Sequence, residues 1–275
     1  MVLYRGRLDG PRRPPGEGGV GLPGWRAPAD LAVVLPALDE AGALPGLLRR
    51  LLAAGGPGLA VIVVDDGSRD GTANVAAGWR SQLPRLKVVR HDRNRGLGAA
   101  LVTGWRTALE ALPDQGIIVT MDADGTHDPA LLPDLVSLVR GGADVAIASR
   151  FAPGGGEMGL SLPRRAFSLG ARLVLSALRP IPGVRDYTCG YRAYRAGLLR
   201  RALEVHGPVG LVSSSGFACT AEVLLKLAGL GGRCAEAPMV LHYEQKAGRS
   251  KMRVGRTLLG YVQLLRATRI RRPAA

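Results

Sequence analysis

From Leu31 onward, short apolar runs alternate with longer segments in which apolar and polar residues are mixed. Short apolar runs bounded by turn residues are typical of buried strands, and the longer mixed segments are typical of helices. The expected strands are Leu31–Ala37, Leu59–Asp65, Leu86–His91, Gly116–Met121 and Ala143–Ser149, and the expected helices are Ala41–Ala54, Asp70–Leu83, Gly98–Leu112, Pro129–Arg140 and a later one around Cys219–Leu230. This alternation predicts right-handed crossovers, a mostly parallel sheet and an α/β fold.

Acidic residues cluster where three of these strands end. The clusters lie in Pro36–Glu40, Asp65–Ser68 and Asp122–Asp124. In open parallel sheets, ligands bind beyond the carboxyl ends of the strands. We therefore expect the three clusters to converge on one edge of the sheet and to form the functional site.

Asp122 and Asp124 can share one divalent cation at the end of their strand. Mg²⁺ and Mn²⁺ prefer oxygen ligands and usually keep coordination places for substrate phosphates. A turn without metal is the alternative, because this short motif is common. His127 follows the motif, and a structural role is the favoured interpretation for a single histidine there.

The segment Asp65–Ser68 precedes an expected helix. Its carboxylates can accept hydrogen bonds from the N–H groups of a nucleobase. The alternative is that this acidic stretch only caps the helix, and Asp70, which follows the segment, is the candidate for the N-cap. The glycine-containing segment Arg95–Leu101 does not fit a dinucleotide-binding fingerprint, because Leu101 stands at the third glycine position.

The chain of 275 residues carries a formal charge of +15, which indicates an anionic partner: nucleic acid, a membrane surface or phosphorylated substrates. Much of the excess lies between Gln245 and Ala275, a stretch with basic residues and no acidic one. Aromatic residues make up only 4% of the chain, which argues against a nucleic-acid protein that stacks bases.

Three regions are expected: a disordered Gly/Pro-rich extension (1–29), a catalytic domain (30–245) and a basic amphipathic tail (246–275). Segments 163–180 and 254–265 are amphipathic, and either could be a core-facing helix or a helix lying in a membrane interface. No apolar stretch is long enough to span a bilayer. The scattered cysteines Cys189, Cys219 and Cys234 indicate a reducing compartment.

The order of motifs resembles inverting family 2 glycosyltransferases of the GT-A fold. It consists of Leu35–Glu40, Asp65–Thr72, Asn94–Gly98 and Asp122–Asp124. Further segments resemble the dolichyl-phosphate mannose synthase branch of that family: Ala148–Phe151, Arg164 with Ser168, Asp186–Arg195 and Gly248–Lys251. The resemblance extends from about Leu31 to Leu265.

The resemblance implies roles for individual residues. Pro36, Glu40, Val64 and Asp66 would hold the donor nucleotide, and Leu38 stands where the family often stacks an aromatic ring on the base. Asp122 and Asp124 would hold Mg²⁺ or Mn²⁺, with Thr126 offering a hydroxyl and the backbone of Ala123 nearby. Arg150 would face the phosphates, Arg164 and Ser168 would grip the acceptor phosphate, and Lys251 would lie in a loop that closes over the donor. Arg165, Arg192 and Arg195 are instead interpreted as solvated surface charges.

The implied activity is transfer of mannose from GDP-mannose to a polyprenyl phosphate, with inversion at the anomeric carbon. The alternative is a relative that uses UDP-glucose or another UDP-sugar. The enzyme would sit on the cytoplasmic face of a membrane, held by its amphipathic segments or by a small membrane-protein partner, and would not bind nucleic acid.

Overall fold

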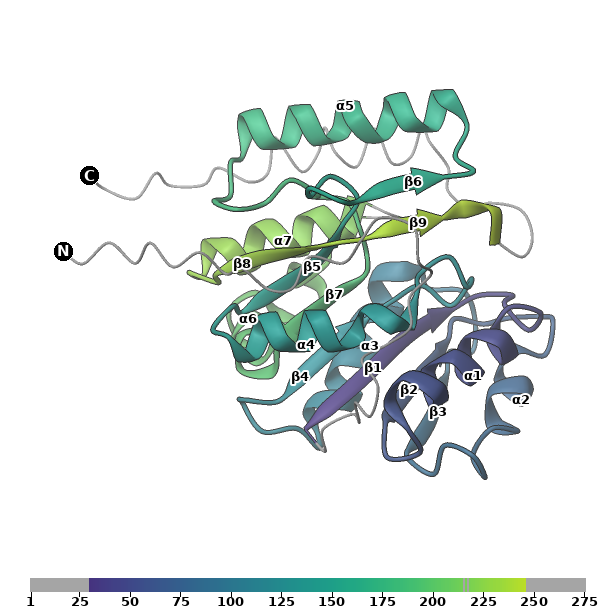
Figure 1. Cartoon of the computed structure of the whole chain (residues 1–275). Helices are drawn as coiled ribbons and strands as arrows, with labels where there is room; N and C mark the ends of the chain where they lie inside the picture. Colours follow the sequence, from purple (N-terminus) through teal and green to yellow (C-terminus); the bar gives the residue numbers. More distant parts are fainter. Residues whose placement is uncertain (1–29, 215, 217, 246–275) are drawn as a thin grey trace.

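A seven-stranded sheet forms the centre of the described molecule (Figure 1). The computed structural model describes residues 30–214, 216 and 218–245. The strand order is β3-β2-β1-β4-β7-β5-β8. The strands are β1 (Leu31–Ala37), β2 (Ala60–Asp65), β3 (Leu86–Arg90), β4 (Ile117–Thr120), β5 (Val145–Ser149), β7 (Arg192–Arg195) and β8 (Cys234–Pro238). A separate two-stranded sheet pairs β6 (Gly156–Met158) with β9 (Val240–His242).

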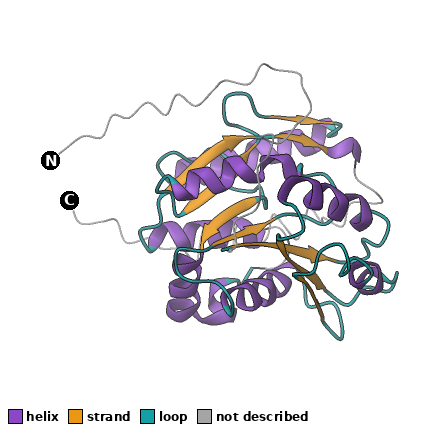
Figure 2. Ribbon diagram, turned by 60° about the horizontal axis from the view of Figure 1, so that its bottom comes forward, coloured by secondary structure: helices purple, strands orange, loops and turns teal. Residues whose placement is uncertain are grey.

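Helices cover both faces of the large sheet (Figure 2). α3 packs on β1 and β2 and contacts α6, which in turn contacts α7, whereas α4 packs on β5 and β7 from the face that α1 and η1 share. The helices are α1 (Leu44–Gly55), α2 (Thr72–Ala77), α3 (Leu97–Leu109), η1 (Pro129–Leu131), α4 (Leu132–Arg140), α5 (Leu162–Leu178), α6 (Ala196–Leu211), α7 (Ala218–Gly229) and η2 (Tyr243–Gln245).

The predicted alternation is confirmed, and so is a mostly parallel sheet. All five expected strands are present, and β1, β2, β3 and β4 pair in parallel. The exception is β7, which runs antiparallel between β4 and β5. Its sequence, Arg-Ala-Tyr-Arg, has too few apolar residues to stand out as a central strand.

The helix predicted over Asp70–Leu83 is wrong in length. α2 ends at Ala77, and the chain continues through turns in which Trp79 N–H donates to Ala76 O at 3.0 Å. The predicted cap is also wrong, because the N-cap is Gly71, which adopts φ 86°. Asp70 instead accepts a hydrogen bond from the N–H of Thr72 at 3.0 Å.

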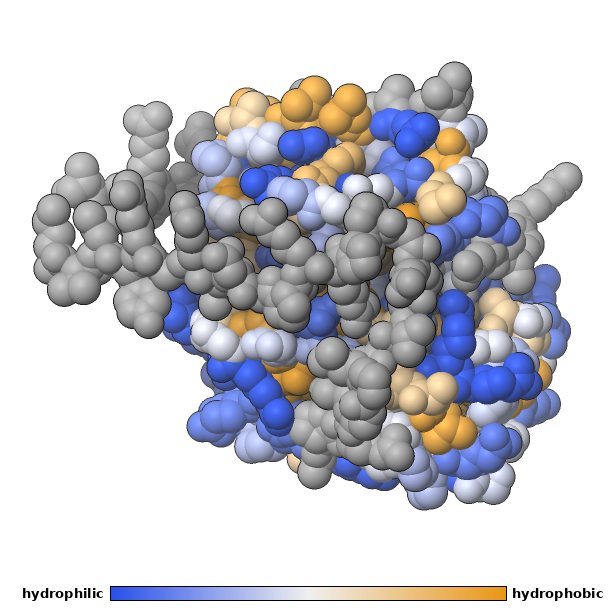
Figure 3. Space-filling view, in the orientation of Figure 1, coloured by the Kyte–Doolittle hydropathy of each residue, from blue (hydrophilic) through white to orange (hydrophobic). Residues whose placement is uncertain are grey.

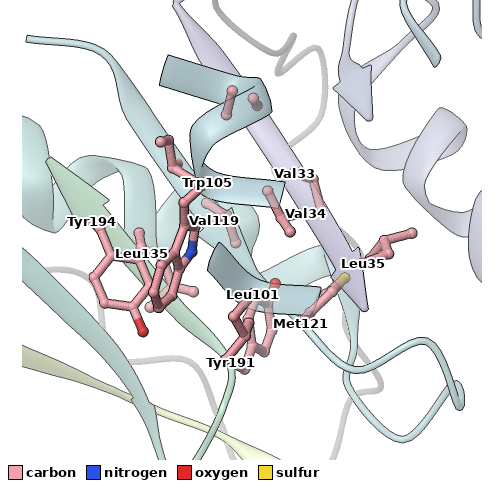
Figure 4. Packing of buried hydrophobic residues seen from close by; sticks show 14 of the residues in the cluster. Val33, Val34, Leu35, Leu101, Trp105, Val119, Met121, Leu135, Tyr191 and Tyr194 are labelled. Carbon is pink, nitrogen blue, oxygen red and sulfur yellow. The ribbon is translucent and has the colours of Figure 1, made fainter. Parts of the chain in front are cut away.

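The core includes residues of the sheet and of the helices α1, α3 and α4. Every residue of β1 except Pro36 is buried, as a strand with neighbours on both sides and helices on both faces requires. In Figure 4 the rings of Trp105 and Tyr194 meet edge to face, with centroids 5.7 Å apart. α3 approaches β1 closely at Gly104, where a Cβ would stand 2.2 Å from Val34 Cγ1.

α5 lies apart from the sheet, along the side of the molecule above β6 (Figure 1). Two of its own residues, Ser168 and Leu175, are buried. Its leucines and valine on the opposite side are exposed: Leu169 (44%), Leu173 (56%), Val174 (46%) and Leu178 (53%). A core-facing role is therefore wrong for these four residues, although Leu175 on the same helix belongs to the hydrophobic core. The second amphipathic segment, 254–265, lies outside the described residues.

Candidate active site

The sheet opens between β1 and β4 at its carboxyl edge. The chain passes from β1 through β2 to β3 and then returns to the other side of β1 as β4, so the strand order reverses there. Pairing between β1 and β4 ends at Val34 and Thr120, and the two strands then part. Pro36 sits just beyond this point, where a missing N–H costs no hydrogen bond to β4. Ligands bind at such a switch point in open α/β sheets.

The loops that follow β1 and β2 are held together by backbone-to-side-chain hydrogen bonds. Asp39 N–H donates to Ser68 Oγ at 2.8 Å, and Asp39 Oδ1 accepts from the N–H of Arg69 at 2.8 Å. Glu40 N–H donates to Thr72 Oγ1 at 2.9 Å. Asp39 adopts φ 49°, a left-handed conformation that Asp tolerates better than most residues. The predicted donor residues Pro36, Leu38 and Glu40 thus lie on an ordered rim.

Asp66 is less accessible than the sequence suggested. Its side chain is buried and accepts hydrogen bonds from the N–H groups of Arg95 at 2.9 Å and Gly96 at 2.8 Å. His91 Nδ1 lies 2.7 Å from Asp66 Oδ1, and its Nε2 lies 2.9 Å from Thr103 Oγ1. Asp66 therefore anchors the start of α3 to β2, and contact with a nucleobase stays a prediction.

Val64 belongs to the core. Its residue is fully buried in β2, and a Cβ at Gly104 on α3 would lie 3.2 Å from its Cγ2. Its side chain is therefore packed against α3, which limits any donor contact to the backbone.

Asp122 and Asp124 follow β4 at the open edge. Asp124 is 7% exposed, and its Oδ1 accepts from the N–H and the hydroxyl of Thr126 at 3.1 and 2.7 Å. Gly190 lies beside Asp122, because a Cβ there would be in ordinary van der Waals contact with Oδ1, at 3.5 Å. Buried Ala123 separates the two acids.

This donor set fits a hard divalent cation. It offers carboxylate oxygens and a hydroxyl, which Mg²⁺ and Mn²⁺ prefer. Within the described ranges, no group of three or more His, Cys, Asp or Glu could hold a metal ion. Two protein carboxylates suit a metal that takes its remaining ligands from water and substrate phosphates.

His127 has a structural role, as expected. It is buried, and its ring stacks on Tyr191 with centroids 5.2 Å apart. Its Nδ1 accepts a hydrogen bond from the N–H of Asp122 at 3.1 Å. The histidine therefore fixes the backbone of the first aspartate.

Arg150 follows β5 on the same edge of the sheet and is held by buried carboxylates. Its Nε and Nη2 contact Asp186 Oδ2 and Oδ1 at 2.7 and 2.8 Å, a bidentate pair. Nη1 contacts Glu157 Oε1 at 3.0 Å, and Nη2 also donates to Thr188 Oγ1 at 2.6 Å. Burial alone would raise the pKa of Asp186, but the guanidinium beside it holds that pKa below the usual value. A contact between Arg150 and substrate phosphates stays a prediction.

The partners of Arg150 were missed by sequence reasoning. Asp186 lies at the start of a segment noted for its resemblance, but nothing local marks it as the counter-ion of a residue 36 positions earlier. Glu157 follows three glycines and carries no motif of its own.

The predicted acceptor residues are only partly described. Ser168 is buried on α5, and its hydroxyl donates to Glu157 Oε1 at 3.2 Å. Arg164 lies in the first turn of α5, but its side chain is not among those described. Lys251 lies outside the described residues, as do the predicted segments 1–29 and 246–275.

The interpretation of Arg192 as a solvated charge is wrong. Its residue is fully buried, and its guanidinium donates to the carbonyls of Thr220 at 2.5 Å and Tyr187 at 2.8 Å. Arg195 is also engaged, because its Nε contacts Asp144 Oδ1 at 3.1 Å. Both arginines belong to β7, a central strand, which explains the burial of Arg192, whereas Arg195 at the end of the strand is partly exposed.

A cavity of about 540 Å³ lies elsewhere, beside the start of α3. Its walls include Arg95, Arg106, Thr103 and Val212 but neither Asp122 nor Asp124. A much smaller cavity touches Pro36, Asp122 and Gly190.

The fold is that of an α/β enzyme, and it brings a pair of carboxylates to the switch point of the sheet. The chain belongs to glycosyltransferase family 2, since the profile described as "Glycosyl transferase family 2" matches residues 32–203.

Curated relatives resemble most of the chain. The undecaprenyl-phosphate mannosyltransferase of Micrococcus luteus is 36% identical over 222 residues, which cover 81% of this chain and 87% of that protein. The polyprenol monophosphomannose synthase of Mycolicibacterium smegmatis is 34% identical and covers 80% of both chains. The dolichol-phosphate mannosyltransferase of Pyrococcus furiosus is 31% identical over 85% of this chain and 62% of its own length.

A solved structure supports the GT-A fold. Glucosyl-3-phosphoglycerate synthase from Mycobacterium tuberculosis, in complex with Mn²⁺, UDP and phosphoglyceric acid, superposes with a TM-score of 0.58. It is 23% identical, and the match covers 90% of this chain and 84% of that chain. The same enzyme has also been solved with Mg²⁺ and UDP.

Proposed function

We propose that this protein transfers mannose from GDP-mannose to a polyprenyl phosphate and yields a β-linked lipid phosphomannose. The observation that carries the proposal is the Asp122–Asp124 pair at the switch point, in a chain whose curated relatives are named for polyprenyl-phosphate or dolichol-phosphate mannosyl transfer. Transfer from a UDP-sugar is the alternative, because no described contact selects the base.

The donor would lie across the open edge of the sheet. Its nucleoside would rest on the rim formed by Pro36, Leu38 and Glu40, and its diphosphate would reach Asp122 and Asp124. Asp122 and Asp124 would hold Mg²⁺ or Mn²⁺, which would supply positive charge to balance the charge on the departing diphosphate. Thr126 orients Asp124 for this role through the hydrogen bonds to its Oδ1.

The acceptor needs little help from a base. A phosphate monoester has a second pKa of about 6 and is mostly a dianion at neutral pH. One of its oxygens forms a bond to the anomeric carbon while the bond from that carbon to the diphosphate breaks, and GDP leaves with the electron pair. Positioning and charge screening then supply most of the rate enhancement. Inversion follows from attack opposite the leaving group.

The test is transfer of labelled sugar into an organic-extractable lipid. Purified protein, undecaprenyl phosphate and Mn²⁺ are offered GDP-mannose, UDP-glucose or UDP-GlcNAc in parallel reactions, with Asp124→Ala as control. Label from GDP-mannose that disappears in the variant supports the proposal. Label from a UDP-sugar alone would replace the donor, and no transfer from any donor would count against a lipid phosphate acceptor.

We further propose that α5 holds the enzyme on the cytoplasmic face of a membrane, with or without a small membrane-protein partner. No helix within the described ranges has the length and apolar character needed to cross a bilayer. At the top of Figure 3, over α5, hydrophobic residues lie next to hydrophilic ones. Exposed leucines with arginines on the flanks, such as Arg172, suit the boundary between acyl chains and headgroups.

Vesicle flotation tests this attachment. Leu173→Asp should reduce binding to vesicles that contain an anionic phospholipid, because it places a charge on the apolar side of α5. Val209→Asp is the matched control, since Val209 is 81% exposed on α6. Equal loss in both variants, or no loss in either, would contradict attachment through α5.

A further inference from the structure

One carboxylate oxygen connects two residues that the resemblance assigns to substrate phosphates. Glu157 Oε1 lies 3.0 Å from Arg150 Nη1 and 3.2 Å from Ser168 Oγ. Arg150 comes from the end of β5, and Ser168 comes from α5. The side chains of Glu157 and Arg150 are only 8% and 11% exposed, so this arrangement is largely shielded from water.

Glu157 contacts the Nη1 side of the Arg150 guanidinium, whereas Asp186 and Thr188 contact the other two nitrogens. Asp186 holds Nε and Nη2, and Thr188 also contacts Nη2. Nη1 is therefore the nitrogen through which Arg150 could meet a substrate phosphate, and the contact described for it is with Glu157.

The net charge around Arg150 is unfavourable for a phosphate as long as Glu157 stays in place. One guanidinium faces two carboxylates, Asp186 and Glu157, so this group of three carries a net negative charge. Arg165 Nη2 donates to the backbone carbonyl oxygen of Glu157 at 3.4 Å. A phosphate beside Arg150 and Ser168 would lie close to the negative charge of Glu157 and would be repelled by it.

The backbone around Glu157 lies outside the large sheet. Glu157 lies in the three-residue strand β6, after Gly154 and Gly155 and before Gly159. Gly154 and Gly159 adopt φ values of 90° and 71°, which only glycine adopts readily. β6 pairs with β9 rather than with the large sheet, so a shift of Glu157 would not disturb the central strands.

α5 has a second contact with the same group. The ring of Phe151, the residue after Arg150, contacts two guanidiniums, with Arg150 Cζ at 5.3 Å and Arg172 Cζ at 4.8 Å from its centroid. Arg172 belongs to α5. The helix that carries the predicted acceptor residues is thus joined to Arg150 through both Glu157 and Phe151.

We propose that Glu157 is a positioning residue that takes the place of the acceptor phosphate. In the substrate-free enzyme its carboxylate holds Arg150 and Ser168 at the spacing that a phosphate requires, and the phosphate group of the acceptor displaces it. Glu157 thereby keeps the guanidinium and the hydroxyl ordered, at the cost of weaker acceptor binding. This inference rests on the proposed function, because it needs an acceptor with a phosphate group.

Glu157→Gln tests the proposal, since the amide keeps the shape of the side chain and one acceptor oxygen but loses the negative charge. Calorimetric titration with farnesyl phosphate, in the presence of GDP and Mn²⁺, should give a Kd about tenfold lower than that of the wild type, a factor that corresponds to about 1.4 kcal/mol. The Kd for GDP with Mn²⁺ should stay within about twofold of the wild-type value. In transfer assays the KM for the acceptor should fall while kcat changes less.

Three controls keep the result interpretable. Glu157→Ala removes the same charge and should tighten farnesyl phosphate binding in the same direction, even if it unfolds at a lower temperature. Glu157→Asp keeps the charge and should bind like the wild type. Asp114→Asn removes a carboxylate that pairs with Arg200 at 2.9 Å before β4, on the opposite edge of the sheet, and should leave the Kd unchanged.

Unchanged or weaker binding of farnesyl phosphate in both Glu157→Gln and Glu157→Ala would overturn the proposal, as would equal tightening of GDP. Inorganic phosphate serves as a second probe, and tightening for inorganic phosphate without tightening for farnesyl phosphate would also contradict a role toward the lipid acceptor. If the wild type binds GDP but no farnesyl phosphate, the proposed acceptor class fails together with this inference. If the wild type binds both and only the effect of Glu157 is missing, the proposed function stands and the inference fails.

Discussion

The two halves of the site are built in different ways. On the proposed donor side, the loops after β1, β2 and β4 are fixed by hydrogen bonds that involve the backbone, such as those from Asp39 N–H to Ser68 Oγ and from Thr126 N–H to Asp124 Oδ1. On the proposed acceptor side, Arg150 is fixed by buried ion pairs with residues from other segments. The donor side thus depends on hydrogen bonds of short sequence motifs. The acceptor side depends on ion pairs between residues that are distant in the sequence.

From this difference we expect substitutions on the donor side to lower activity and substitutions on the acceptor side to lower stability. Asp124→Asn removes one of two carboxylate charges at the metal-type site while the Thr126 hydrogen bonds can still be accepted. Transfer should fall by about a thousandfold, because metal-assisted charge stabilisation contributes several kcal/mol. The thermal unfolding midpoint should change little. Measurements of kcat/KM and of the unfolding midpoint on the same variant check this. A large loss of stability in Asp124→Asn would contradict the expected difference between the two sides.

Asp186→Asn should instead cause a large loss of stability. It leaves the buried guanidinium of Arg150 without its bidentate partner, and breaking a buried pair in this way costs about 3 to 5 kcal/mol of stability. Denaturant unfolding measures the loss. Asp114→Asn is the control, because its partner Arg200 and the carboxylate itself are exposed and such pairs contribute about 1 kcal/mol or less. Similar losses in both variants would mean that burial of the Arg150 pair does not matter.

Acid should lower the stability of the fold, on the acceptor side through Asp186 and near the start of α7 through Glu222. Burial alone would raise the pKa of Asp186 and of Glu222, but Arg150 in the first case, and Lys226 with Ser213 in the second, hold both pKa values below the usual range. Depressed carboxyl pKa values contribute stability that is present above the unfolded value of about 4 and is lost as the pH falls through the folded value.

Unfolding midpoints measured from pH 7 to pH 3 should therefore stay flat and then drop below about pH 4. Asp186→Asn should show a shallower drop, since one of the responsible groups is gone. A midpoint that already falls between pH 7 and pH 5 would point to a histidine instead.

The smallest expected effect concerns the loop contacts of the donor side. Ser68→Ala removes the hydroxyl that accepts from Asp39 N–H and should cost about 1 kcal/mol of stability, the typical contribution of one hydrogen bond. Because the loop carries Leu38 and Glu40, the KM for the donor should rise more than kcat falls. Ser176→Ala, which removes a local hydrogen bond to Leu173 O on α5, is the control and should leave the donor KM unchanged.

The same contrast explains what the sequence could predict. The strands β1, β2 and β4 and the acidic residues at their ends were predictable, because each is a local pattern with a short-range physical cause. β7 and the partners of Arg150 were not, because a strand with two arginines becomes central only when Thr220 and Tyr187 supply carbonyls to Arg192. The exposure of α5 could not be decided either, since its amphipathic pattern is the same whether the apolar side faces a core or solvent.

The outward leucines of α5 also bear on how the enzyme would meet its acceptor. An enzyme held flat on a bilayer by this helix samples lipids by lateral diffusion in two dimensions. The relevant concentration of acceptor is then its mole fraction among the surrounding lipids, and dilution of the bulk solution changes nothing. Addition of inert phospholipid would slow such an enzyme even at constant total acceptor, so that the composition of the membrane itself becomes a control on the rate.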